Sequence, residues 1–129
     1  MTAARNLLVL SGLLALAACS APPQPQVTTV CDLPNFPQRL VQFNAQVAPR
    51  RDGRVFIMDA RCAAIHIDLR LTGAATRFGL DGKLKTAAEG LTDPTTVRMP
   101  VKLTGVFTSD PGGSYFTAET IAEMSAGQS

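Results

Sequence analysis

Residues 40–47 read Leu-Val-Gln-Phe-Asn-Ala-Gln-Val, and after Leu40 apolar side chains alternate strictly with polar ones. A repeat of two residues is typical of a β-strand that buries one face and exposes the other. The same alternation returns in residues 65–71 and 97–103. Because an amphipathic helix would space its apolar residues three or four apart, these stretches predict a mainly β protein.

The pairing of the first strands follows from the turns between them. Asp52-Gly53 separates the first strand from a second one over residues 55–59, and this dipeptide favours a two-residue turn. A four-residue loop over residues 60–63 would then lead into the third strand. Both turns predict that Phe56 and Met58 point into the core. The opposite, outward face then holds Val55, Ile57, His66, Asp68 and Arg70, with Gln42, Asn44, Gln46 and Arg50 beside them.

The rest of the chain predicts one short helix and two more strands. Residues 84–89 favour a helix, and Gly90 stands where a glycine commonly ends one. Strand character returns over residues 97–108, where Pro100 indicates an edge or a bulge because proline lacks an N–H donor. The last strand is expected over residues 115–124. The predicted order is therefore β-β-β-α-β-β.

This order resembles the OB-fold, a small five-stranded β-barrel. The resemblance runs from Leu40 to Met124 and is closest in residues 101–107 and 115–121, where Gly105 can ease the bend of a curled strand. It implies a closed barrel. An open antiparallel sheet, or a two-sheet sandwich with one short helix, would also accommodate the same strands.

The first 18 residues have the features of a secretory signal peptide: Arg5, then an apolar stretch too short to span a bilayer. The stretch ends in Leu16-Ala17-Ala18-Cys19, which resembles the lipobox of bacterial lipoproteins. That resemblance implies lipidation of Cys19, cleavage before it and acylation of the new amino terminus. Ser20 in the next position implies anchoring in the inner leaflet of the outer membrane, facing the periplasm. The alternative is an ordinary secreted protein cleaved near Ala18.

Beyond the leader we expect a lipidated Cys19 with a Pro/Gln-rich spacer over residues 19–30, a single domain over residues 31–124 and a disordered tail over residues 125–129. Once Cys19 is set aside, Cys31 and Cys62 remain as a pair in an oxidising compartment, which predicts a disulfide. Closing a loop of about 30 residues stabilises a fold by roughly 3 to 4 kcal/mol. A metal-binding or reactive-thiol role is the alternative.

Composition argues against several kinds of chemistry. The chain has 129 residues, a formal charge of +2 and one histidine, so neither nucleic-acid binding by charge alone nor a histidine-based metal site is expected. Gly112-Gly113 opens no helix and is no phosphate-binding loop. We predict no cofactor and no metal. The sole catalytic candidates are His66 and Asp68, which are two residues apart on one strand but have no nucleophile indicated nearby.

The remaining signal is a basic cluster of Arg50, Arg51 and Arg54 around the first turn. The OB resemblance implies a ligand surface on the second and third strands and their flanking loops, with Tyr115 near the other loop. We therefore expect a non-enzymatic interaction module for an envelope protein, a glycan or lipid phosphate, and not for nucleic acid. The alternatives are an envelope enzyme or enzyme accessory that uses His66 and Asp68, and a purely structural lipoprotein. The candidate binding face comprises Arg50, Arg51, Arg54, Ile57, His66, Asp68 and Arg70.

Overall fold

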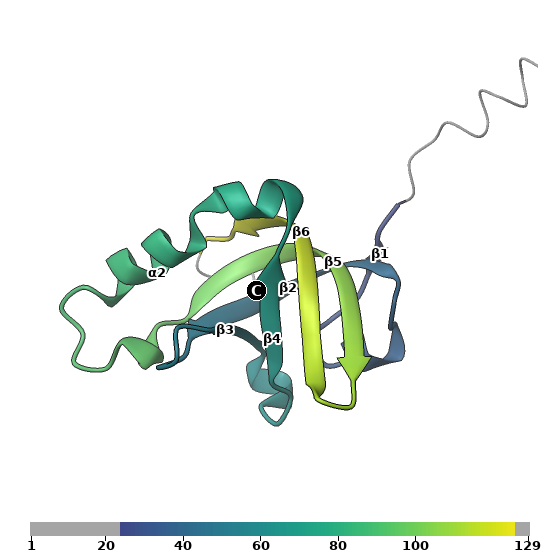
Figure 1. Ribbon diagram of the computed structural model, residues 1–129, viewed down its shortest axis with the longest axis horizontal. Coiled ribbons are helices and arrows are strands. Elements are labelled where there is room, and N and C mark those ends of the chain that lie inside the picture. Colours follow the sequence, from purple (N-terminus) through teal and green to yellow (C-terminus); the bar gives the residue numbers. More distant parts are fainter. Residues whose placement is uncertain (1–23, 126–129) are drawn as a thin grey trace, which may run out of the picture.

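The computed structural model describes residues 24–125 as a curled sheet with one α-helix packed against it (Figure 1). The strands are β1 (Gln26–Val27), β2 (Leu40–Pro49), β3 (Val55–Met58), β4 (Ile67–Leu71), β5 (Met99–Asp110) and β6 (Gly113–Glu123). The helix is α2 (Leu80–Ala88), and the short 3-10 helices are η1 (Leu33–Asn35), η2 (Ala60–Cys62), η3 (Gly73–Phe78) and η4 (Pro94–Thr96). No helix within residues 24–125 is long and apolar enough to span a membrane.

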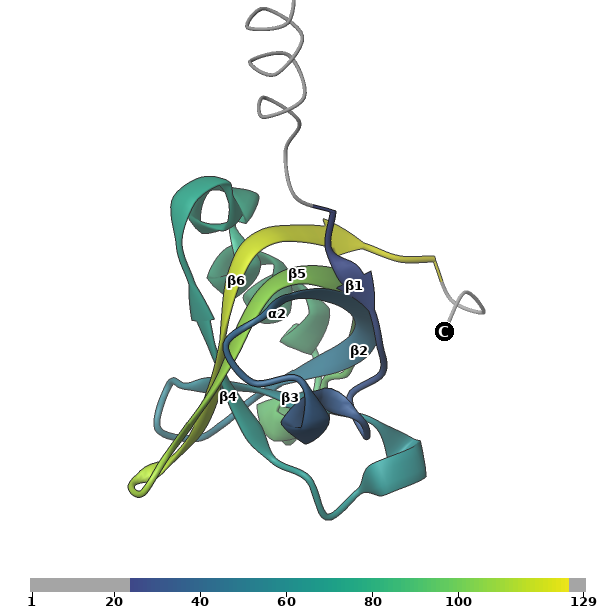
Figure 2. The same ribbon diagram turned by 90° about the vertical axis from the view of Figure 1, so that its right-hand side faces the viewer.

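Strands β2 to β6 close into a barrel with the OB-fold topology (Figure 2). The sheet order is β2-β3-β4-β6-β5, and β5 pairs back onto β2 to complete the ring. All neighbours are antiparallel except β4 and β6, which run parallel because the chain crosses from one to the other through η3, α2 and β5. The predicted five-stranded barrel is therefore confirmed, and the open sheet and the sandwich are excluded.

The core fills the barrel with the inward residues of every strand. Phe43 and Phe116 meet edge to face with ring centroids 4.8 Å apart, an arrangement that aromatic pairs favour. From α2, Leu80 and Leu84 reach the same core, since residues four apart lie on one helix face. This packing explains why the helix begins at Leu80, four residues before the predicted start, despite Gly82. Gly90, in the left-handed region at φ 81°, follows the helix end as expected.

The register between β2 and β3 differs by one residue from the prediction. Val47 lies opposite Ile57, not Met58. The hairpin has a three-residue turn, in which the Gly53 N–H donates to the Arg50 carbonyl and only Gly53 has positive φ. A two-residue turn would have needed positive φ at Asp52 as well. The prediction that Ile57 lies on the outward binding face is therefore wrong: its side chain is 0% exposed.

A second shift of one residue occurs between β3 and β4 and cancels the first. Ile57 lies opposite Ile67, because the chain between the strands runs through η2 and is longer than the four residues expected. As a result, β4 keeps the predicted orientation and Ile67 is buried while Asp68 points outward. In β3 alone the faces are exchanged, so Phe56 and Met58 point outward, contrary to the prediction.

The β5–β6 hairpin contains an irregularity that a glycine permits. Thr104 pairs with Thr120 but Gly105 pairs with Ala118, so β6 carries one extra residue at this point. A Cβ on Gly105 would collide with the Thr117 carbonyl and lie 2.9 Å from the Ala118 Cα. Pro100 lies at the end of the β5–β6 ladder, where its carbonyl accepts the Met124 N–H. Because the N–H and C=O of one residue point to the same neighbouring strand, the missing N–H would also have faced Met124, so the proline costs at most one bond at the end of the ladder.

β1 is an additional strand that was not expected within the spacer. Gln26 and Val27 pair in parallel with Val41 and Gln42 of β2. Val27 is 77% exposed, so β1 adds main-chain pairing and buries little apolar surface.

Candidate functional site

The outward surface of β3, β4 and β6 brings three side chains into one row. Phe56 lies opposite Asp68, and Asp68 lies opposite Tyr115 on the parallel neighbour β6. Each of the three is adjacent in its strand to a buried residue, namely Ile57, Ile67 and Phe116. Because neighbouring residues of a strand point to opposite faces, all three side chains point outward. Arg70, two residues after Asp68, continues this surface.

Two arginines of the β2–β3 turn lean onto this row and share one carboxylate. Arg50 Nη1 lies 3.5 Å from Asp68 Oδ1, and Arg54 Nη1 lies 3.8 Å from Asp68 Oδ2. Exposed pairs of this kind contribute little to stability. They do hold both guanidinium groups over the sheet. Arg54 also lies 3.9 Å from Asp52, so two carboxylates face these two arginines, and the excess positive charge of the surface comes from Arg51 and Arg70.

Aromatic rings lie among these charges. The Arg70 guanidinium carbon sits 3.7 Å from the centroid of the Tyr115 ring, a cation–π contact. The Phe56 and His66 rings are tilted against each other with centroids 5.6 Å apart. The sequence predicted no aromatic side chain on the second and third strands of this face. Phe56 was missed because the one-residue error in the turn placed it in the core.

A shallow hollow beside the turn gathers more arginines. It measures about 470 Å³ and lies between the β2–β3 turn and η4. Its lining includes Arg50 and Arg51 from the turn, and Arg98, whose Nη1 donates to the Thr95 carbonyl at 2.7 Å. Arg98 was missing from the predicted face. Only the folded chain places residue 98 beside residue 51, so no local pattern could have included it.

Asp93, the residue before η4, lines a neighbouring hollow that it shares with Arg50 and Arg51. The Thr95 hydroxyl and N–H donate to its Oδ1 at 2.6 and 3.0 Å, and these bonds lower the pKa of the Asp93 carboxyl, with a smaller contribution from the charge of Arg51. Asp93 therefore remains ionised at neutral pH and partly balances the basic turn.

His66, the residue before β4, and Asp68 of β4 both point outward, as their spacing predicted, but they are not arranged as a catalytic pair. Asp68 is engaged by Arg50 and Arg54, and His66 packs against Phe56. Within residues 24–125 no hydrogen bond joins the His66 imidazole to Asp68. An acid that orients a histidine base must hydrogen-bond to it.

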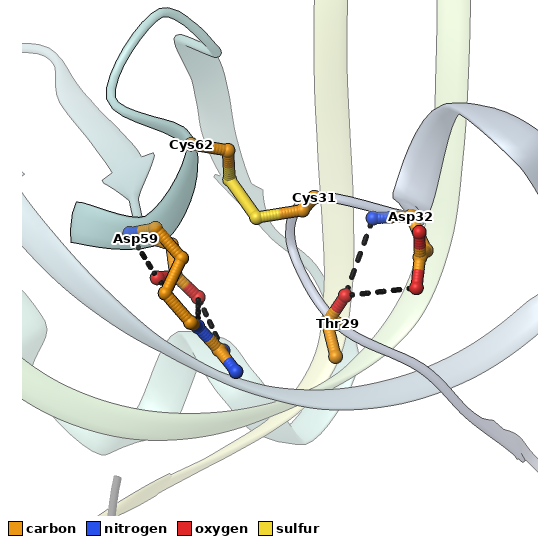
Figure 3. Close-up of a disulfide and its surroundings, with 6 residues drawn as sticks. Thr29, Cys31, Asp32, Asp59 and Cys62 are labelled. Carbon is orange, nitrogen blue, oxygen red and sulfur yellow. Dashed lines mark hydrogen bonds and ion pairs between the residues drawn. A yellow bond between two sulfur atoms is a disulfide. The ribbon is translucent and has the colours of Figure 1, made fainter.

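The predicted disulfide is confirmed (Figure 3). Cys31 and Cys62 are bonded, with their Cα atoms 5.6 Å apart. Asp59 lies nearby, within 4.8 Å of both sulfur atoms, but bonded sulfurs are not the thiolates that bind metals. The Arg61 guanidinium lowers the pKa of the Asp59 carboxyl by hydrogen bonds as short as 2.6 Å, which outweigh the opposing effect of burial.

Several parts of the sequence prediction lie outside the described residues: the leader over residues 1–18, the lipidation site Cys19 with the first residues of the spacer, and the predicted tail after residue 125. The described chain begins at Gln24, just before β1. β1 pairs with the first residues of β2, and the basic turn follows its last residue, so the two lie at opposite ends of β2.

Comparisons with known proteins are limited to the fold. No family profile and no curated protein sequence matches the chain. Among solved structures, it is similar to the second OB-fold domain of replication protein A from Methanococcus maripaludis, with 14% identity, 81% of this chain and 100% of that chain covered, and a TM-score of 0.49. It is also similar to the OBody AM1L10, solved bound to hen egg-white lysozyme, with 18% identity, 82% and 97% coverage and a TM-score of 0.47. The assignment of the OB-fold rests on the strand order and the parallel β4–β6 pair.

Proposed function

We propose that this protein is a non-enzymatic, lipid-anchored module of the bacterial cell envelope that binds an anionic partner. Its ligand surface, called here the arginine face, comprises Arg50, Arg51, Arg54, Phe56, His66, Asp68, Arg70, Arg98 and Tyr115. The observation that carries the proposal is the gathering of guanidinium groups and aromatic rings on one outward surface of the barrel. Arginine pairs with carboxylate and phosphate in two-pronged geometry, which suits an anion-bearing ligand.

Position along the chain supports a partner on the periplasmic side over the lipids of the anchoring leaflet. A Pro-rich spacer extends about 3.1 Å per residue, so the few residues between Cys19 and Gln24 would keep the amino-terminal end of the barrel close to the bilayer. The basic turn lies at the opposite end of β2. The β5–β6 hairpin tip likewise lies far from β1 in both views (Figures 1 and 2). An acidic envelope protein or an anionic envelope polymer fits this orientation.

The test is in-cell photo-crosslinking with the photoreactive residue placed at Phe56, His66 or Arg70 of the full-length protein. A discrete adduct is expected at these positions and not at spacer positions. Reversing Arg50, Arg51 and Arg54 together to Glu should abolish the adduct, because it replaces attraction by repulsion. The matched control reverses Arg39, Arg77 and Lys102, which are exposed elsewhere on the barrel, and should leave the adduct intact. An adduct that survives the turn reversal refutes the arginine face.

Two further measurements separate the other parts of the proposal. His66→Ala should leave function unchanged apart from a modest loss of binding, whereas an enzyme that used His66 as its base would lose activity completely. Metabolic labelling with an alkyne-bearing fatty acid should mark the wild-type protein and not Cys19→Ser. If the wild-type chain took up no label, the proposed lipid anchor would be refuted and the alternative of an ordinary secreted protein would remain.

A further inference from the structure

Strand β3 carries apolar side chains on both of its faces. Ile57 fills the core with no exposed surface, whereas Phe56 and Met58 point outward and remain partly exposed. A strand that turns one face to water normally carries polar residues there, because apolar surface is costly to hydrate. The outward side of β3 therefore has more apolar surface than the barrel itself requires.

The strand register extends this apolar surface from Met58 across β2 and β5 to the end of β6. Met58 lies opposite Gln46 of β2, and Gln46 lies opposite Pro100 of β5. The Pro100 carbonyl accepts the N–H of Met124, the residue after β6. All four residues line the same hollow, and Gln46 is the single polar member of this row.

This hollow, called here the methionine hollow, measures about 270 Å³ and carries no net charge. Asp59 and Arg61 also line it. The Arg61 guanidinium donates to the Asp59 carboxylate at distances down to 2.6 Å, so their charges neutralise each other. Methionine side chains are flexible and polarisable, and they adapt to apolar groups of different shapes. The methionine hollow therefore suits an apolar side chain better than an ion.

The hollow of about 470 Å³ beside the basic turn, called here the arginine hollow, has the opposite character. Phe56, two residues before Met58, belongs to its lining. The lining also holds three arginines and one aspartate: Arg50, Arg51, Arg98 and Asp52. The guanidinium of Arg51 and the Nη2 of Arg98 donate no hydrogen bond within residues 24–125. The arginine hollow therefore has donors and positive charge available for an anion.

The two hollows adjoin along the outward side of one strand. Residues two apart in a strand lie about 7 Å apart on the same face, and Phe56 and Met58 have this spacing while lining one hollow each. A polymer that carries only charged and hydroxyl groups would use the arginine hollow and leave the methionine hollow empty. A protein segment with a carboxylate beside an apolar side chain would use both.

We propose that the two hollows together bind a segment of an acidic protein that presents acidic and apolar side chains on one face. This inference rests on the proposed function and narrows its anionic partner to a protein. The carboxylates pair with the arginine hollow, and an apolar side chain enters the methionine hollow. The segment lies across the outward face of β3 and does not extend the sheet, because β2 and β4 already pair with β3 on either side.

The test begins with selection from a random peptide library displayed on phage, with the full-length protein as the target. Selected peptides should place an acidic residue two positions from an apolar one if they bind extended, or three to four positions from it if they bind as helices. The variant with Arg50, Arg51 and Arg54 reversed to Glu should select no such peptides, because attraction to the carboxylates is replaced by repulsion.

A matched pair of variants then tests the methionine hollow with one selected peptide, followed by fluorescence anisotropy. Met58→Gln keeps the length of the side chain but makes it polar, and it should weaken binding at least about fivefold. Val106→Thr makes the same kind of change on the outward side of β5, outside both hollows, and should stay within about twofold of wild type. A peptide with its apolar residues replaced by serine should bind wild type at least about tenfold more weakly and no longer distinguish Met58→Gln from wild type.

The outcomes separate this inference from the proposed function. Equal affinity of Met58→Gln and wild type, or selected peptides with acidic residues alone, overturns the inference and leaves the arginine face in place. A selection that yields no peptide also overturns it, and binding of inorganic polyphosphate that the turn reversal abolishes would then assign the arginine face to a polymer. Peptides whose binding survives the turn reversal overturn both proposals.

Discussion

Removing the Cys31–Cys62 disulfide tests how much the loop that it closes contributes to the stability of the barrel. The change is the double substitution Cys31→Ser with Cys62→Ser. The cysteines are 31 residues apart in sequence. A cross-link that closes a loop of this length lowers the entropy of the unfolded chain enough to stabilise the fold by about 3.7 kcal/mol at 25 °C. Both cysteines are only half-buried, so the serines leave no dry, unpaired hydroxyl and the loop-closure effect dominates.

The assay is urea unfolding followed by circular dichroism. The double variant should lose about 3 to 4 kcal/mol of unfolding free energy, which for a domain of about 100 residues lowers Tm by on the order of 15 °C. Wild-type protein unfolded in the presence of a reductant is the control and should behave like the variant. A loss of less than about 1 kcal/mol would refute the loop-closure reasoning.

Three further predictions concern the register, the barrel bend and the acid sensitivity. Ile57→Ala should cost about 2 to 5 kcal/mol of unfolding free energy because its side chain is fully buried. Phe56→Ala should cost clearly less, because Phe56 is half-buried on the outward side of β3. The reverse order of the two losses in urea unfolding would favour the register that a two-residue turn predicts. Gly105→Ala should lower the unfolding free energy by about 3 kcal/mol or more, because the added Cβ would collide with the Thr117 carbonyl. A variant with an unchanged Tm would contradict the close approach of β5 and β6. Because Arg61 lowers the pKa of Asp59, the ionised carboxylate stabilises the fold at neutral pH, and this contribution is lost as the pH falls below about 4. The Asp59→Asn variant should therefore be less stable than wild type at pH 7 and nearly equal to it near pH 2. A constant difference in unfolding free energy across that range would refute the role of the Asp59 charge.

Much of the candidate site follows from local sequence, and its errors have one origin. Arg50 and Arg54 flank a turn, and His66, Asp68 and Arg70 alternate on one strand, so their shared surface could be predicted. Phe56 and Ile57 exchanged places because an Asp-Gly pair fits both a two-residue turn and a three-residue turn that ends in a left-handed glycine. The choice between these turns is decided by which β3 residue packs best against Val47, and that packing is a tertiary contact.

By itself, the sequence determined the strand-forming stretches and the order of the elements, because alternation and turn residues are local properties. Once Cys19 is set aside for its resemblance to a lipobox cysteine, the two remaining cysteines allow one pairing, that of Cys31 with Cys62. The tertiary structure alone decided which face of β3 is buried and where α2 begins. A shift of one residue in a turn changes few local energies but reverses every side chain of the strand that follows. Only the packing of the closed barrel distinguishes the two arrangements.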